Sequence, residues 1–309
     1  MNSLIFPGQG SQMVGMAKNL YDNFSYINKL FLKADEILGF KISELILNGP
    51  KEKLNLTENT QPAIFLVSYS ICELIKNETK FDLNKSSYFA GHSLGEYSAL
   101  TASNHLSFEQ TIKLLQIRGR AMQSAVPEGE GGMLAILGSE FKNIDNMLKE
   151  KEKKYQCFIA NDNSNGQIVV SGKTYDLNLL AEDLNNYKIK NIKLPVSAPF
   201  HCKLMKPATD IMNNEIKNTN FMYSENLIVS NVTAKETNKT NEIKDLLIKQ
   251  IESPVRWRES ILYMLEKGVR KFIEIGPGKV LSGLIKRIDR NVEIITINDI
   301  DDLKNLNND

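Results

Sequence analysis

The sequence has little cysteine and no long apolar run, and each absence excludes a class of protein. Only three cysteines occur in 309 residues, and Cys72, Cys157 and Cys202 are too widely spaced for a CxxC pair. We therefore expect no disulfide framework and no bound metal. No segment reaches the roughly 18 apolar residues of a membrane-spanning helix, and the first residues show neither region of a signal peptide. These absences predict a cytoplasmic protein that makes no contact with a membrane.

An excess of charge of either sign is also missing. Lysine and arginine together number 38 and aspartate and glutamate 37, so the formal net charge is +1. A chain with so little net positive charge is not expected to bind nucleic acid as its main ligand. Hydrophobic residues make up 42% and charged residues 24%, which is the balance of an ordinary soluble globular protein. The length suggests about two domains, or one large domain with an insertion.

Strand-like and helix-like patterns alternate along most of the chain, and the rhythm changes once. The alternation predicts an α/β fold with a mostly parallel sheet covered on both faces. Between Pro127 and Pro195 the order becomes β-α-β-β-α-β, which is that of a ferredoxin-like unit. The segments that give this order are 133–137, 140–153, 157–160, 167–171, 174–186 and 189–194. We predict a large domain formed by residues 1–126 and 196–309, with an inserted small domain at residues 127–195.

Two local signals predict where helices begin. Pro62 is expected to open an apolar helix that runs to about residue 75, since proline is tolerated in a first helical turn. Ser107 followed by Gln110 forms a capping-box pattern, which predicts a helix from there to about residue 124.

A nucleophile-elbow pattern, GxSxG, occurs at Gly91-His92-Ser93-Leu94-Gly95. It follows a predicted strand at 87–90 and precedes a predicted helix, which is the context that this motif requires. The alternative is an ordinary strand-turn-helix junction with an incidental serine. In the favoured interpretation the turn exposes the Ser93 hydroxyl as a nucleophile.

A serine hydroxyl needs a positioned base, and the chain has only three histidines. His92 adjoins the serine on the same tight turn, so its ring should point away from the hydroxyl. His105 lies between two predicted helices and is expected at the surface. His201 lies in a proline-bounded loop where the large domain resumes, and it is the predicted base, although a structural histidine is the alternative. Cys202 is too close to His201 in sequence to be a favoured nucleophile.

The order of these residues differs from that of ordinary α/β-hydrolases. Those enzymes place the histidine near the C-terminus, after the acidic residue, whereas residues 202–309 follow His201 here. The order therefore indicates a different class of enzyme with the same elbow.

Five motifs occur in an order that resembles the malonyl-CoA:acyl-carrier-protein transacylases, an acyltransferase family of fatty acid synthesis. They are Phe6-Pro7-Gly8-Gln9-Gly10-Ser11-Gln12, Gly91-His92-Ser93-Leu94-Gly95-Glu96, Arg118-Gly119-Arg120-Ala121-Met122-Gln123, Pro199-Phe200-His201-Cys202 and Glu274-Ile275-Gly276-Pro277-Gly278. The resemblance covers nearly the whole chain. It implies an α/β-hydrolase-like domain that carries a ferredoxin-like insertion.

The resemblance also implies a mechanism. Ser93 would take the malonyl group from malonyl-CoA and pass it to the phosphopantetheine thiol of acyl carrier protein, with His201 as base. The main-chain carbonyl of Gln250 would orient His201, and the N–H groups of Gln9 and Leu94 would form the oxyanion hole. A structural turn is the alternative for the glycine-rich segment around Gln9. No cofactor is expected besides the coenzyme A of the substrate and product, and we expect a monomer.

Substrate choice is assigned by the same resemblance to Arg118 and Phe200. A guanidinium can bind the free carboxylate of malonate with two parallel hydrogen bonds, and the bulk of Phe200 would disfavour a methyl branch. Taken alone, the sequence around Arg118 favours a surface arginine of the predicted helix, and the resemblance reverses that preference. Four basic residues are candidates for docking the carrier protein, namely Lys203, Lys206, Lys286 and Arg287.

Two other functions remain open at this point. A serine hydrolase related to thioesterases or lipases would have the same elbow, and it would release free malonate without a thiol acceptor. A binding module without catalytic activity would need neither Ser93 nor His201. The sequence also leaves open whether the product enters fatty acid or polyketide synthesis.

Overall fold

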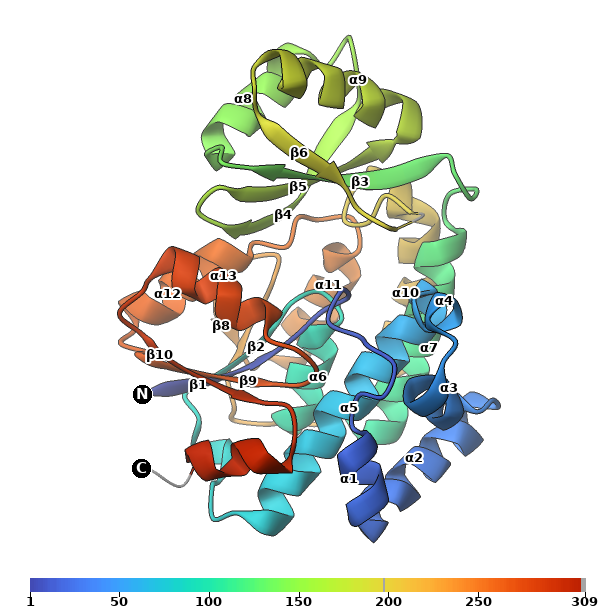
Figure 1. The fold of residues 1–309 in the computed structure, drawn as a ribbon, viewed down its shortest axis with the longest axis vertical. Coiled ribbons are helices and arrows are strands. Elements are labelled where there is room, and N and C mark those ends of the chain that lie inside the picture. Colours follow the sequence, from blue (N-terminus) through green and yellow to red (C-terminus); the bar gives the residue numbers. More distant parts are fainter. Residues whose placement is uncertain (197, 307–309) are drawn as a thin grey trace.

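The structure, a computed structural model, describes residues 1–196 and 198–306. Residues 197 and 307–309, which belong to the predicted large domain, lie outside the described residues. The described chain contains a six-stranded sheet and a four-stranded sheet, and Figure 1 shows the smaller sheet above the body that contains the larger one. The fold is therefore mixed α/β, as predicted.

The larger sheet is parallel except at one edge. Its order is β10-β9-β1-β2-β7-β8, and only β8 runs antiparallel to its neighbour. The strands are β1 (Asn2–Phe6), β2 (Tyr88–Gly91), β7 (Ile228–Val229), β8 (Glu236–Thr237), β9 (Lys271–Ile275) and β10 (Glu293–Ile297). β1 and β2 pair so that Phe6 lies opposite Gly91. The glycine-rich turn after β1 therefore begins beside the elbow after β2.

Helices cover both faces of this sheet (Figure 1). The helices of the larger body, some of which pack on other helices, are α1 (Lys18–Asn23), α2 (Ser25–Leu38), α3 (Ile42–Asn48), α4 (Lys51–Leu54), α5 (Thr57–Glu78), α6 (Gly95–Ala102), α7 (Phe108–Ser124), α10 (Lys206–Asn218), α11 (Thr240–Gln250), α12 (Trp257–Glu266) and α13 (Val280–Ile288). Short 3₁₀ turns lie at Leu83–Lys85, Lys203–Met205 and Ile300–Leu306.

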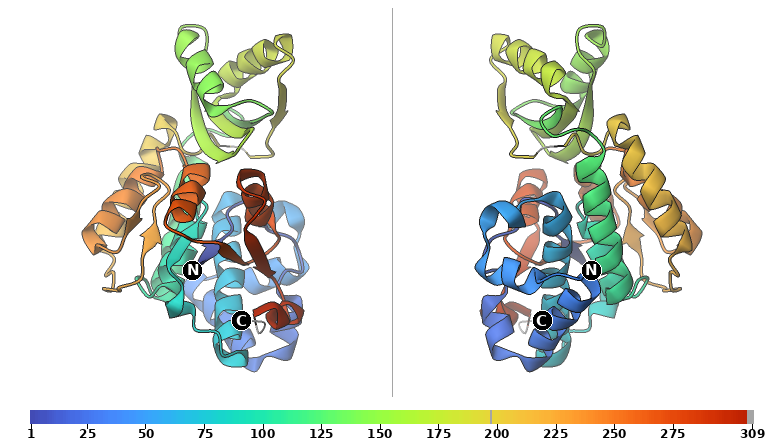
Figure 2. Two further views of the ribbon diagram at one scale, coloured as in Figure 1. Left: turned by 90° about the vertical axis from the view of Figure 1, so that its left-hand side faces the viewer. Right: turned by 90° about the vertical axis from the view of Figure 1, so that its right-hand side faces the viewer.

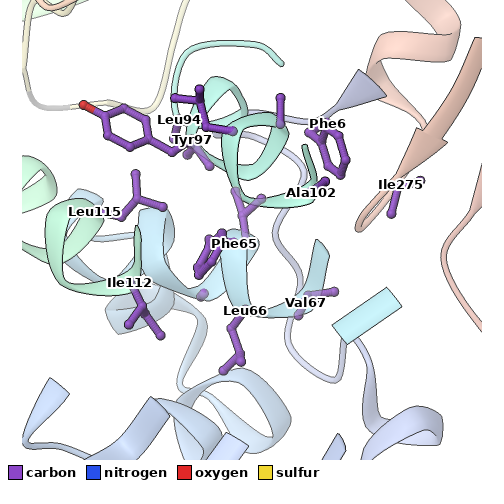
Figure 3. Packing of buried hydrophobic residues seen from close by; sticks show 14 of the residues in the cluster. Phe6, Phe65, Leu66, Val67, Leu94, Tyr97, Ala102, Ile112, Leu115 and Ile275 are labelled. Carbon is purple, nitrogen blue, oxygen red and sulfur yellow. The ribbon is translucent and has the colours of Figure 1, made fainter. Parts of the chain in front are cut away.

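Side chains of successive strand residues alternate between the two faces, which produces two separate cores. Phe6 packs with Phe65 of α5 and Leu94 of the elbow in the larger core (Figure 3). Ile5, the residue before Phe6, packs instead with Trp257 of α12. Full burial of each large apolar side chain stabilises the fold by about 1.5–3 kcal/mol. The parallel sheet is therefore covered by apolar side chains on both faces, as predicted.

One of the two predicted helix starts is confirmed and the other is wrong. The side chain of Ser107 accepts a hydrogen bond from the Gln110 N–H at 3.2 Å, and the Gln110 side chain accepts one from the Ser107 N–H at 2.9 Å. The helix predicted to start at Pro62 starts at Thr57 instead, so Pro62 lies inside α5. Proline lacks the N–H that would bond to the fourth residue before it. The residues before and after Pro62 in α5, from Thr60 to Ser68, are buried. We infer that this packing keeps the helix continuous through the missing hydrogen bond.

The smaller sheet is antiparallel and comes entirely from the predicted insertion. Its order is β4-β5-β3-β6. The elements are β3 (Gly131–Leu137), α8 (Phe141–Glu150), β4 (Cys157–Ser164), β5 (Gln167–Lys173), α9 (Thr174–Asn186) and β6 (Lys190–Lys193). Every strand and helix predicted for this segment is present. The two side views in Figure 2 show α8 and α9 on the face of the sheet that points away from the larger body.

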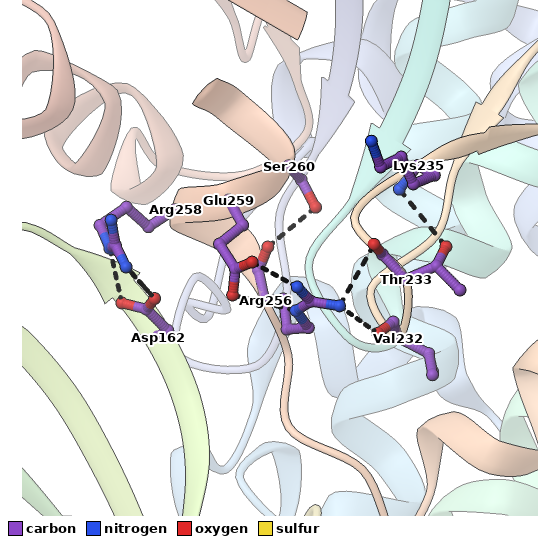
Figure 4. Close-up of polar contacts among 8 residues, drawn as sticks. All are labelled: Asp162, Val232, Thr233, Lys235, Arg256, Arg258, Glu259 and Ser260. Carbon is purple, nitrogen blue, oxygen red and sulfur yellow. Dashed lines mark hydrogen bonds and ion pairs between the residues drawn. The ribbon is translucent and has the colours of Figure 1, made fainter. Parts of the chain in front are cut away.

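A bidentate ion pair joins the smaller sheet to the larger body (Figure 4). Arg258 of α12 donates from Nε and from its terminal nitrogen to both carboxylate oxygens of Asp162 on β4, at 2.8–3.0 Å. Main-chain bonds lie beside it, because the Val255 N–H donates to Ala160 and the Asp162 N–H donates to Val255. The Asp162 side chain is 1% exposed, so loss of its partner would leave a buried charge uncompensated. These contacts hold β4 close to the carboxyl ends of the parallel strands.

Candidate active site

Ser93 lies at a sharp turn between β2 and α6. Its φ of 55° is in the left-handed region, which non-glycine residues seldom adopt outside strained turns. A Cβ on Gly91 would come within 1.9 Å of the Gly95 carbonyl carbon, and one on Gly95 within 2.2 Å of the Phe6 oxygen. Both glycines of the motif are therefore required by close main-chain contacts, and the turn presents the Ser93 side chain beyond the end of the sheet.

The structure brings together Ser93, His201 and Gln250, which are far apart in sequence. The Ser93 Oγ lies 2.8 Å from His201 Nε2, and His201 Nδ1 lies 2.9 Å from the main-chain oxygen of Gln250. A carbonyl oxygen can only accept, so Nδ1 carries the proton of the neutral ring. Nε2 then accepts from the serine hydroxyl, which is the arrangement that a general base requires.

Burial keeps this imidazole neutral. His201 is 4% exposed. Desolvation and, to a smaller extent, the positive charge of Arg118 lower the pKa of His201 to about 3. At neutral pH the ring therefore holds its lone pair free for the Ser93 proton.

Arg118 points from α7 into the same site and is fully buried. One terminal nitrogen donates to the Gln61 side chain at 2.8 Å. The other donates to Ser93 Oγ at 3.1 Å and to the Gln250 side-chain oxygen at 2.9 Å. The alternative of a surface arginine is therefore wrong. Within residues 1–196 and 198–306, no carboxylate pairs directly with this guanidinium.

A cavity of about 220 Å³ lies between the elbow and the smaller sheet. All of the predicted site residues except Gln250 line it, namely Gln9, Ser93, Leu94, Arg118, Phe200 and His201. A Cβ on Gly8 would come within 2.5 Å of the His92 oxygen, so the turn after β1 lies directly against the elbow. The N–H groups of Gln9 and Leu94 donate no hydrogen bond to any other described residue.

The loop that carries Phe200 and His201 is held against the smaller sheet. The Ser171 hydroxyl of β5 donates to the Phe200 main-chain oxygen at 2.5 Å. His201 itself has a φ of 60°, so the loop turns tightly at this residue. Phe200 is 6% exposed and is one of the residues that line the cavity.

The other two histidines have structural contacts. His92 Nε2 lies 2.8 Å from the Asn163 side-chain oxygen. The prediction that His105 lies at the surface is wrong, because its side chain is fully buried and Nδ1 lies 2.9 Å from the Ser103 hydroxyl. The chain around Ser224 covers this turn, since the Ser224 hydroxyl donates to the Ser103 oxygen at 2.7 Å. Burial lowers the pKa of His105 to about 4.

Cys202 does not offer an alternative nucleophile. Its Sγ donates to the Pro199 oxygen at 3.1 Å, and burial raises the pKa of this thiol to about 11. Thiolate, the reactive form of cysteine, is therefore scarce at neutral pH.

Asn231 is a site residue that the sequence analysis missed. Its side-chain oxygen accepts from the Ser93 N–H at 2.8 Å, and its side-chain nitrogen donates to the Gly91 oxygen at 2.7 Å. Asn231 is fully buried, so these bonds clamp the strained turn from both sides. The signal available in the sequence was a polar residue two positions after the short buried strand β7, at the edge where ligands of parallel sheets bind.

The four candidate docking residues have local contacts on the structure. The Lys203 ammonium lies 4.8 Å from the ring centre of Phe158, and Lys206 pairs with Asp210. Lys286 and Arg287 are adjacent on α13, and Arg287 donates to the Gln167 side chain at 2.8 Å. Their role in docking stays a prediction.

Two features are absent from the described residues. No group of three or more His, Cys, Asp or Glu side chains in this part of the chain could hold a metal ion. No helix in it is long and apolar enough to cross a membrane.

Comparisons with known proteins all lead to one family. The family model described as "Acyl transferase domain" matches residues 3–299. The chain is 42% identical over 301 residues to "Malonyl CoA-acyl carrier protein transacylase" of Bacillus subtilis (strain 168), an alignment that covers 96% of this chain and 93% of the relative. It is 40% identical over 299 residues to the protein of the same name from Haemophilus influenzae, with coverages of 96% and 95%.

Solved structures give the same result. A crystal structure of acyl-carrier-protein-S-malonyltransferase from Bartonella henselae superposes with a TM-score of 0.95 and 38% identity, covering 99% of this chain and 98% of that one. A second structure is described as a type II PKS acyl-carrier protein in complex with its malonyl-transacylase. It superposes with a TM-score of 0.95 and 37% identity, with coverages of 100% and 99%.

Proposed function

This chain belongs to the acyl transferase family, and from that premise we propose that it transfers the malonyl group of malonyl-CoA to the phosphopantetheine thiol of an acyl carrier protein. Its curated relatives at about 40% identity over nearly their whole length bear the name of this activity. One similar structure contains an acyl carrier protein bound to its transacylase. The family predicted from the five sequence motifs is confirmed.

The reaction proceeds in two half-reactions at one serine. In the first, Ser93 Oγ forms a bond to the malonyl carbonyl carbon while His201 Nε2 takes the hydroxyl proton. The carbon–sulfur bond of the thioester then breaks, and the proton passes from His201 to the leaving thiolate of coenzyme A. In the second, the phosphopantetheine thiol attacks the malonyl-serine ester by the reverse sequence of steps. The main-chain oxygen of Gln250 holds the imidazole in the tautomer that both steps need.

The N–H groups of Gln9 and Leu94 act as the oxyanion hole. Each tetrahedral intermediate places a negative charge on the former carbonyl oxygen, and donors already in position stabilise it without reorganisation. One such donor contributes about 3 kcal/mol in well-studied serine enzymes. The support here is that both groups line the cavity and make no other hydrogen bond among the described residues.

Arg118 binds the free carboxylate of the malonyl group. A buried guanidinium without a directly paired carboxylate is a site for an incoming anion, because the uncompensated charge is costly. Its terminal nitrogen already lies 3.1 Å from Ser93 Oγ, which is the right region for a three-carbon acyl chain. Phe200, at the cavity wall, limits the volume beside this chain and disfavours branched acyl groups.

The same family membership supports a finer description of the fold. The large domain, residues 1–126 and 196–309, is α/β-hydrolase-like, and residues 127–195 form a ferredoxin-like insertion. The strand order β4-β5-β3-β6, with every neighbouring pair antiparallel, is the order that a βαββαβ unit of this kind adopts. The protein functions as a cytoplasmic monomer that needs no cofactor.

The observation that carries the proposed function is the convergence of His201 and Arg118 on the Ser93 hydroxyl. The test is incubation with radiolabelled malonyl-CoA, followed by addition of an acyl carrier protein in its phosphopantetheinylated form. We expect label on the protein, its transfer to the carrier protein, and no label on Ser93→Ala. Release of free malonate at the same rate without any thiol acceptor would identify a hydrolase. Binding of malonyl-CoA without protein-bound label would identify a module without catalytic activity.

A further inference from the structure

The charge of Arg118 is linked to a carboxyl group through an amide. Its terminal nitrogen donates to the Gln250 side-chain oxygen at 2.9 Å, and the nitrogen of the same amide donates to Glu96 Oε2 at 2.8 Å. Arg118, Gln250 and Glu96 are 0%, 0% and 2% exposed, respectively. The three side chains therefore form a buried relay of cation, amide and carboxyl group beneath the reacting serine. The reaction described above assigns no role to Glu96.

The direction of the Gln250 amide is fixed by the groups on its two sides. Besides Glu96, the Gln250 side-chain nitrogen donates to the Ser93 main-chain oxygen at 3.1 Å and to the Asn231 side-chain oxygen at 3.3 Å. The main-chain N–H of Asn231 donates to Glu96 Oε2 at 3.1 Å, so this oxygen is an acceptor. A guanidinium, by contrast, can only donate. The amide must therefore turn its nitrogen to Glu96 and its oxygen to Arg118. A side chain at position 96 without an acceptor would remove the acceptor nearest to the Gln250 side-chain nitrogen. The orientation of the amide would then be less firmly held.

Glu96 also supports the turn that carries the nucleophile. It lies in the first turn of α6, directly after the elbow. Its bond to the Asn231 main chain holds the residue whose side chain clamps Ser93 and Gly91. The Glu96 carboxyl group thus contacts two residues of the site. Gln250 in turn contacts Arg118, and Asn231 contacts Ser93 in the elbow.

We infer that Glu96 is a positioning residue of acyl transfer, whose Oε2 holds Gln250 and Asn231 so that the Arg118 guanidinium stays directed at the acyl carboxylate. The inference rests on the proposed function, because it needs Arg118 to bind the malonyl group. It goes beyond that function in assigning substrate selectivity to a residue that does not touch substrate. Glu96 acts by accepting hydrogen bonds, so a side chain that accepts at the same place can replace it.

The test compares Glu96→Ala with Glu96→Gln in kcat/KM for malonyl-CoA and for acetyl-CoA. Loss of a buried acceptor of this kind is expected to lower malonyl kcat/KM by about tenfold or more. The malonyl-to-acetyl ratio should fall in Glu96→Ala, since acetyl has no carboxylate for Arg118. Glu96→Gln places an amide oxygen at Oε2, so its ratio should stay within about threefold of the wild type.

Two results would overturn the inference. One is a malonyl-to-acetyl ratio in Glu96→Ala equal to that of the wild type, which would leave Glu96 a purely structural role. The other is an equal fall of the ratio in Glu96→Gln, which would show that accepting these bonds is not what matters. Should Glu96→Ala fail to fold, Glu96→Asp replaces it. The shorter side chain withdraws the carboxylate by one methylene, so the same fall in ratio is expected.

A matched control separates lost stability from lost positioning. Asp35 is a buried carboxylate that accepts from the N–H and the hydroxyl of Ser43 at 2.8 and 2.6 Å, away from the cavity. Asp35→Ala should lower the melting temperature and leave the malonyl-to-acetyl ratio unchanged. Failure of the proposed function itself would be visible in the wild type, which would then acquire no label from malonyl-CoA.

Discussion

The main-chain oxygen of Gln250 accepts a hydrogen bond from His201 Nδ1 at 2.9 Å. Gln250 is the last residue of α11, where main-chain carbonyls have no partner within the helix. The end of a helix therefore supplies the acceptor that an acidic residue supplies in the serine hydrolases. Because the side chain of the same residue accepts from Arg118, the base and the cation of the site are held by one residue.

His201→Ala is expected to slow acylation of Ser93 by about two to four orders of magnitude, which is the usual contribution of a general base. The rate of label incorporation in a rapid-quench experiment measures this step. The fold should tolerate the change, since His201 lies in a loop at the cavity. A loss of less than about tenfold would mean that another group accepts the proton.

Arg118→Ala should change the preference between malonyl-CoA and acetyl-CoA more than it changes the rate of acyl transfer to Ser93. The malonyl carboxylate would enter a buried site without its cation, and loss of one partner of such a pair costs about 2–5 kcal/mol. Acetyl-CoA carries no carboxylate, so its kcat/KM should change little or rise. The measured quantity is the malonyl-to-acetyl ratio of kcat/KM.

Arg118→Lys is the matched variant for this experiment. Lysine keeps the charge but cannot form two parallel hydrogen bonds to a carboxylate. Its ratio should lie between those of the wild type and of Arg118→Ala. Equal losses for both substrates in both variants would instead give Arg118 a role in the fold or in the catalytic geometry.

Asn231→Ala should weaken the elbow. It leaves the Ser93 N–H and the Gly91 oxygen without partners in a buried position, and each unsatisfied group costs about 1–3 kcal/mol. We expect a lower melting temperature and a lower kcat for malonyl-CoA and acetyl-CoA alike, because the position of Ser93 serves both substrates. An unchanged kcat would show that the two glycines hold the turn without the clamp.

Acylation should remain fast in mildly acidic solution. Protonated imidazole cannot accept the Ser93 proton, so a histidine of ordinary pKa near 6.5 would lose about half of its activity at pH 6.5 and most of it at pH 5. Burial and the charge of Arg118 lower the pKa of His201 to about 3, so the base form persists through this range. The single-turnover acylation rate should therefore be nearly flat from pH 8 to pH 5.

Glu96 is another titrating group of the site, where it accepts a hydrogen bond from Gln250. Burial raises the pKa of Glu96 to about 7. A protonated carboxyl still accepts through its carbonyl oxygen, so its titration should add no step to the profile. Glu96→Gln provides the control, because it should give the same flat profile. A fall centred near pH 6.5 in both proteins would assign an ordinary pKa to His201.

Much of the fold was predictable because its signals are local. The periodic segments of residues 127–195 predicted every strand of the smaller sheet and both helices that pack on it. Ser107 with Gln110 predicted the start of α7. These patterns depend on residues a few positions apart, which a sequence displays directly. The elbow is local in the same sense, since Gly91 and Gly95 allow the close contacts that its turn requires.

Tertiary structure decided whatever depends on contacts between distant segments. His105 is buried because a segment more than a hundred residues later covers its turn, and no pattern around His105 indicates that cover. Arg118 could have been a surface residue of α7 until the folded chain placed Gln61, Ser93 and Gln250 around it. Hydrogen-bond partners and desolvation arise only when separate segments pack together, so the sequence determined which chemical groups are available, and the packing determined which of them meet.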